Sequence, residues 1–294
     1  MKDFSYCIAT DSCANLPDAL FRAYDIRVIP MIYIVDGEER LSYSRDAQTD
    51  LRAYYALMRE KVPMSTSCVA RENCEAVFTE ILNEGKDILY IGFSSGLSAT
   101  FDVAAKVMEE LGAAYPGRKL IAVDSLSASL GQGLLIAETA KRQEQGADLE
   151  TAAQWAADNR LKTAHFFTVD TLQYLYRGGR LKKTAYLLGN ALNIRPVLRV
   201  NNEGHLEPIA KTLGRRPSLR VIADHIADNI GDPETAALYI GHGDCIEDVE
   251  ALLARIRDRM PVKDENIVIN YIDLVIGVHS GPGTIAAFCM AAKR

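Results

Sequence analysis

Three segments in the first half of the chain repeat one order of residues: an apolar run, then small polar residues, then a helical pattern. The apolar runs are "YCIA" (6–9), "DILYIGF" (87–93) and "LIAV" (120–123), and hydroxyl or acidic side chains follow each of them. Continuous apolar strands that alternate with helices indicate a parallel sheet covered on both faces. Because ligands of such sheets bind beyond the carboxyl ends of the strands, this edge is the predicted site.

The second half of the chain has a different pattern, in which strands are joined by hairpins as well as by helices. Its strands are predicted at 164–169, 194–200, 236–244 and 266–272. A chain of 294 residues exceeds one ordinary domain, so two domains are expected. The predicted fold class is α/β, with a Rossmann-like parallel-sheet domain over 1–160, a mixed α/β domain over 161–294, and the ligand at their interface.

The composition excludes several classes of protein. A net charge of −6 argues against nucleic-acid binding and against more than transient contact with a membrane surface. The N-terminal residues contain no long apolar stretch of the kind found in signal peptides, and the last apolar run is too short to span a bilayer. The six cysteines form no C-x-x-C pair and are expected to be small buried hydrophobes. We therefore expect a soluble, cytoplasmic protein.

The segment "GFSSGLSATF" (92–101) has two possible chemical interpretations. A helix that begins directly after Ser95 would place Ser94 and Ser95 at its N-cap, where free N–H groups and the helix dipole attract an anion. Read literally, the segment also fits G-x-S-x-G, the nucleophile elbow of serine hydrolases. In that alternative Ser94 is the nucleophile, His279 the base and Asp124 the acid that orients it.

Three further segments carry candidate functional residues. Ser65-Thr66-Ser67 form a second hydroxyl cluster at a second predicted helix start. "YRGGRLKK" (176–183) is a cationic loop suited to a phosphate or an acidic partner. "GVHSGPG" (277–283) places His279 in a glycine-rich turn between a predicted strand and a predicted final helix at Thr284. No ATP-binding P-loop and no convincing zinc-ligand spacing occur in the sequence.

Taken together and in order, these segments resemble the DegV family, the fatty-acid-binding (FakB-type) subunits of bacterial fatty acid kinase. The resemblance covers nearly the whole chain, and its motifs are "IATDSCANLP", "STSCVA", "FSSGLSATF", "VDSLSASLGQG", "YRGGRL", "NIRPVLRVNNEGHL" and "HSGPG". "STSCVA" departs from the family's T-S-Q-P-S, and Ala99 and Phe101 replace its Gly and Tyr. These departures keep the hydroxyls but change residues expected near the ligand.

The resemblance implies that a long-chain fatty acid lies in an apolar tunnel. Its carboxylate would be held by uncharged groups: Thr66 or Ser67, Ser94 or Ser95, and His279. Arg177 and Arg180 would face the phosphate or a separate kinase subunit, which supplies ATP and forms an acyl phosphate. The chain alone would then be neither an enzyme nor the holder of a cofactor, and the fatty acid would be its ligand. A serine hydrolase that uses Ser94, or a lipid-sensing regulatory protein, remain the alternatives.

Overall fold

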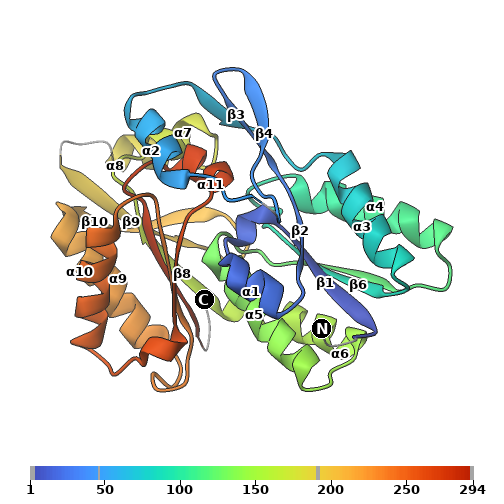
Figure 1. The fold of residues 1–294 in the computed structure, drawn as a ribbon. Helices are drawn as coiled ribbons and strands as arrows, with labels where there is room; N and C mark the ends of the chain where they lie inside the picture. The colour runs from blue at the N-terminus through green and yellow to red at the C-terminus, as the bar shows by residue number, and fades with distance from the viewer. Residues whose placement is uncertain (1–3, 46, 190–192, 292–294) are drawn as a thin grey trace.

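The first sheet of the computed structural model, which describes residues 4–45, 47–189 and 193–291, has four strands (Figure 1). Its order is β2 (Arg27–Ile29), β1 (Tyr6–Asp11), β6 (Asp87–Gly92) and β7 (Leu120–Asp124). All neighbouring strands in it are parallel. The three repeated apolar runs are therefore three adjacent strands, as predicted, and their carboxyl ends meet at one edge.

The second sheet is mixed and contains six strands. Its order is β10 (Leu206–Leu213), β9 (Ile194–Val200), β8 (Thr163–Thr168), β13 (Ile285–Met290), β11 (Leu238–His242) and β12 (Ile267–Tyr271). Only β11 and β12 pair in parallel. The predicted hairpin at 201–204 joins β9 to β10. The parallel first sheet and mixed second sheet confirm the predicted fold class.

A small antiparallel sheet lies beside the first one. Its strands are β4 (Glu38–Leu41), β3 (Ile32–Val35) and β5 (Met64–Thr66). Pro30 separates β3 from β2, because proline has no N–H to donate to a neighbouring strand. The predicted turn at Asp36-Gly37 is present, with both residues at positive φ.

Helices cover both large sheets (Figure 1). α3 (Arg71–Asn83) and α4 (Thr100–Ala114) pack on one side of the first sheet, and α9 (Arg215–Asn229) and α10 (Ile246–Arg257) on the outer side of the second. The remaining helices are α1 (Asp18–Ala23), α2 (Leu51–Arg59), α5 (Leu130–Glu144), α6 (Leu149–Asn159), α7 (Gln173–Arg177), α8 (Lys183–Gly189) and α11 (Leu274–Ser280). None of the helices within the described ranges is long and apolar enough to cross a membrane.

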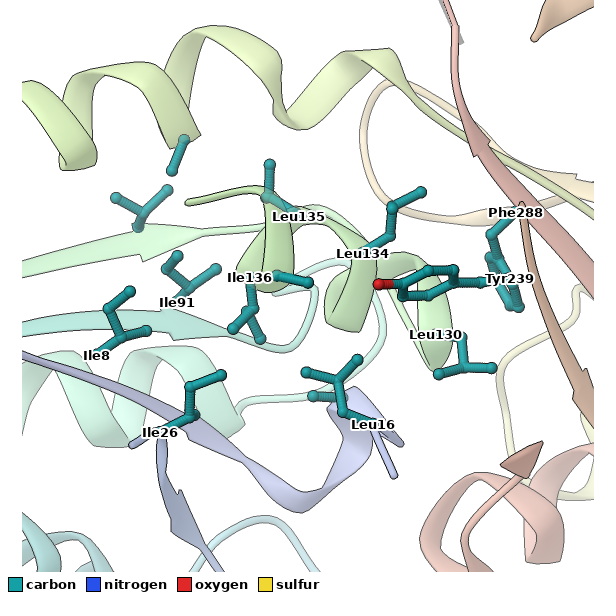
Figure 2. Close-up of a cluster of buried hydrophobic side chains, with 14 of the residues drawn as sticks. Ile8, Leu16, Ile26, Ile91, Leu130, Leu134, Leu135, Ile136, Tyr239 and Phe288 are labelled. Carbon is teal, nitrogen blue, oxygen red and sulfur yellow. The ribbon is translucent and has the colours of Figure 1, made fainter. Parts of the chain in front are cut away.

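α5 packs against both large sheets and joins them into one hydrophobic core (Figure 2). Leu130 and Leu134 lie near Tyr239 and Phe288 of the second sheet, while Ile136 faces the first. The glycines of "GQG" (131–133) permit this close packing, since a Cβ on Gly131 would lie 2.1 Å from the His165 imidazole. These glycines therefore have a packing role. The two sheets share a hydrophobic core, and their division into domains 1–160 and 161–294 stays a proposal.

Two predicted helix boundaries are wrong. α4 begins at Thr100, so Ser94 and Ser95 precede a turn and not a helix N-cap. The segment after Thr284 is the central strand β13 and not a final helix, and His279 lies in the last turn of α11. A short apolar segment that contains alanines can form a helix or a strand. Here the segment pairs with β8 on one side and β11 on the other, and this pairing makes it a strand.

Candidate functional site

An apolar cavity of about 90 Å³ lies between the two large sheets. One wall comes from loops that follow strands of the first sheet, which confirms that its carboxyl edge borders a pocket. The other walls come from the second sheet, α7 and α11. Its apolar lining consists of Met31, Phe93, Leu97, Ala128, Phe167, Leu175, Val200, Leu206, Ile272, Val275, Ile276, Ala286 and Phe288.

Thr66 and His279 meet in the lining of this cavity. The Thr66 hydroxyl and His279 Nε2 lie 2.7 Å apart, and either can be the donor. β5 holds Thr66 by pairing with Tyr33, and α11 holds His279. The structure thus brings together two predicted site residues that are 213 positions apart in the chain.

Glycine-rich backbone fixes the His279 ring. The approach of His279 Nδ1 to Gly178 is so close that a Cβ there would lie 2.1 Å from it. This nitrogen is buried and has no hydrogen-bond partner among the described residues. Burial and, to a lesser degree, the nearby Arg180 charge lower the pKa of His279 to about 4. The imidazole is therefore uncharged at neutral pH.

Arg180, which the resemblance places facing the phosphate or a kinase subunit, lines the same cavity. Its Nε–H donates to the Leu97 carbonyl at 3.1 Å, and Nη1 donates to the Gly178 carbonyl. No carboxylate in the described part of the chain forms an ion pair with it, and burial lowers its pKa. A guanidinium charge is thus available beside Thr66 and His279, in addition to the uncharged donors expected.

A second, more polar pocket shares part of its lining with the apolar cavity. Thr66, Arg180 and His279 line both spaces, and Arg177 lines the outer one only. Arg177 is exposed at the end of α7, while Arg180 is half-buried between the two spaces. The two arginines of "YRGGRL" therefore have different environments: one faces solvent, and the other stands at the boundary.

Ser94 and Ser95 are not among the residues that line the cavity. The buried Ser94 hydroxyl donates to the Gly204 carbonyl at 3.0 Å and so ties the first half of the chain to the β9–β10 hairpin. The exposed Ser95 hydroxyl donates to Asp124 Oδ2 at 2.5 Å. Since Asp124 bonds to Ser95 and His279 bonds to Thr66, these residues do not form the Ser94–His279–Asp124 triad of a hydrolase.

Four other serines line the cavity: Ser67, Ser98, Ser129 and Ser280. Ser67 is one of the predicted alternatives, whereas the sequence pattern did not indicate the other three. Ser98 Oγ accepts a hydrogen bond from the Thr100 N–H at 3.2 Å, a local turn of the kind that serine favours. No group of three or more His, Cys, Asp or Glu side chains that could hold a metal ion occurs in the described ranges.

Comparison with known proteins agrees with this architecture. A DegV domain-containing protein of Clostridium perfringens is 38% identical over 294 residues, which span all of this chain and 99% of the relative. A Thermus thermophilus structure described as fatty acid binding of a DegV family protein is 27% identical, with a TM-score of 0.85 and coverage of 98% of this chain and 99% of that one.

A DegV lipid binding protein from Thermotoga maritima is 25% identical, with a TM-score of 0.85 and 99% coverage of both chains. The family profile described as "Uncharacterised protein, DegV family" matches residues 5–292, nearly the whole sequence. The chain therefore belongs to the DegV family.

Proposed function

We propose that the protein binds one long-chain fatty acid in the apolar cavity, with its carboxylate beside Thr66, His279 and Arg180. One observation carries this proposal. The surface of the cavity is mostly apolar, and three of its polar residues, Thr66, Arg180 and His279, also line the outer pocket. Ser67 and Ser98 offer further hydroxyls in the lining. Ser94 and Ser95 are left out, because their hydroxyls bond to Gly204 and Asp124.

The acyl chain would supply most of the binding free energy. Burial of each methylene contributes about 0.8 kcal/mol, so a long chain gains on the order of 10 kcal/mol before ordering costs. The head group then mainly needs orientation. When His279 Nε2–H donates to Thr66 Oγ1, the Thr66 hydroxyl can donate to the carboxylate without removing its charge, and Arg180 offsets the cost of bringing that charge out of water.

The position of the carboxylate at the boundary of two spaces suits a nucleophile that a partner must reach. We propose that a separate ATP-dependent kinase subunit in the cytoplasm approaches the outer pocket. A carboxylate oxygen then attacks the γ-phosphorus of ATP, the bond from that phosphorus to the ADP oxygen breaks, and an acyl phosphate and ADP form. In this proposal the protein itself contributes no catalytic group and no cofactor.

Lipid content is the direct test of the binding proposal. Protein purified without delipidation is expected to carry about one fatty acid per chain, since an apolar cavity of this size is unfavourable when filled with water. Native mass spectrometry measures the added mass, and denaturing extraction identifies the acid. Protein that is empty as purified and also takes up no added palmitate would contradict the proposal.

The kinase proposal is tested with Arg177, which lines the outer pocket but not the cavity. Arg177→Ala is expected to leave palmitate affinity unchanged and to lower acyl-phosphate formation with the kinase subunit by about tenfold or more, because one charge-assisted contact is lost. Lys183→Ala, which removes an equal charge on α8 outside both pockets, is the control. Equal effects of both variants on acyl-phosphate formation would indicate a general charge effect and contradict a specific role.

A further inference from the structure

One buried hydroxyl in the cavity wall has no hydrogen-bond partner. Ser280, the last residue of α11, is 5% exposed, and its Oγ bonds to no other group of the described chain. The remaining buried polar side chains of the lining are paired: Ser129 Oγ donates to Asn15 Oδ1 at 2.8 Å, and His165 Nε2 lies 2.6 Å from Ser127 Oγ. Thr284 Oγ1 donates to the Ser280 carbonyl at 2.9 Å. Ser280 Oγ is therefore the unsatisfied hydroxyl of the wall.

An unpaired hydroxyl conflicts with a saturated ligand. A buried hydroxyl without a partner is destabilising, and a saturated acyl chain in the cavity offers Ser280 Oγ none. A ligand that carries an oxygen at this point would supply that partner. Resting on the proposed fatty-acid binding, we propose that Ser280 selects fatty acids that are hydroxylated near the carboxylate, at carbon 2 or 3.

The position of Ser280 determines which carbons it can reach. It follows His279 directly, so their Cα atoms are about 3.8 Å apart and their side chains diverge by about 100° around the helix. His279 borders both spaces, whereas Ser280 lines the inner cavity alone. With the carboxylate at His279, Ser280 lies closer to the first carbons of the chain than to its distal end.

The inference is tested by titrating delipidated protein with palmitate, 2-hydroxypalmitate, 3-hydroxypalmitate and 16-hydroxypalmitate. The wild-type protein is expected to bind the 2- or the 3-hydroxy acid about three- to tenfold more tightly than palmitate, the gain of one hydrogen bond. It should show no such gain for the 16-hydroxy acid. Ser280→Ala is expected to abolish the preference while palmitate affinity stays equal or rises.

Two variants control for folding and chemistry. Ser280→Thr keeps the hydroxyl and should retain the preference, and Ser218→Ala makes the same substitution at a buried serine of α9 outside the cavity. Palmitate binding with no hydroxyl preference overturns this inference alone. A loss of palmitate affinity in Ser280→Ala, with no hydroxyl preference in the wild type, would instead make Ser280 a carboxylate ligand and overturn it too. If no acid of either kind binds, the proposed function itself fails.

Discussion

Gly178→Ala is expected to lower the affinity for palmitate about ten- to a hundredfold. The added methyl group would lie 2.1 Å from His279 Nδ1, so the imidazole must move and its contact with Thr66 Oγ1 at 2.7 Å is lost. The Thr66 hydroxyl then loses the group that orients it toward the carboxylate, and a hydrogen bond to such a charged group contributes about 1.5–3 kcal/mol, which corresponds to this range. Titration of delipidated protein with radiolabelled palmitate measures the effect.

The neighbouring glycine provides a matched control. Gly179 has a φ of +75°, and a Cβ there would meet no atom within 4 Å. Gly179→Ala should therefore destabilise the fold by about 1–2 kcal/mol through backbone strain and leave palmitate affinity unchanged. Full palmitate affinity in Gly178→Ala, or an equal loss in both variants, would show that the position of His279 does not govern head-group binding.

Local patterns predicted much of the fold correctly. The continuous apolar runs became β1, β6 and β7, and the mixed pattern after residue 160 became the second sheet. α5 ends at Glu144, two residues before Gly146, which adopts a positive φ of 95° that other residues rarely take. These features depend on residues that are close in sequence, so a single chain contains the signal.

Errors arose where distant contacts decide between local alternatives. Residues 95–99 were predicted to be helical, but the Ser95 hydroxyl bonds to Asp124 and the Ser94 hydroxyl to Gly204, and the chain turns there before α4 begins. Segment 285–290 contains two alanines and suits a helix or a strand equally. Its place between β8 and β11 is fixed by pairing that no local window includes.

The site was only partly predictable for the same reason. Periodicity identified hydroxyl clusters at strand ends, but nothing local indicates that Thr66 meets His279, and only the family resemblance suggested it. The place of Arg180 at the boundary of both spaces depends on how α7 packs against α11. Ser98 lines the cavity from the loop before α4 and Ser280 from the end of α11, and the misplaced helix boundaries obscured both positions.

Asp273, the N-cap of the helix that carries His279, has a carboxyl group whose ionisation should affect the stability of the fold. Its Oδ1 accepts from the Ile276 N–H at 3.0 Å, whereas its buried Oδ2 has no hydrogen-bond partner in the described ranges. Burial, assisted by the charge of Asp11, raises the pKa of Asp273 to about 7 from an ordinary 3.8. The folded state therefore holds this proton more tightly than the unfolded state, and its contribution to stability is present at pH 4 and is lost as the pH rises through 7.

Asp273→Asn keeps a capping oxygen and removes the ionisation. The variant should match the wild type near pH 4 and exceed its free energy of unfolding at pH 8 by on the order of 2–4 kcal/mol, as measured by urea denaturation across this range. Histidines titrate in both proteins and largely cancel in the difference.

Asp148, the exposed N-cap of α6, has a pKa lowered by its bonds to Thr151, so Asp148→Asn should act in the opposite direction and reduce stability at pH 8. The prediction would be wrong if the difference in free energy of unfolding between Asp273→Asn and the wild type stayed constant with pH or fell as the pH rises. The buried carboxylate would then ionise without cost, and α11 would depend on its charge.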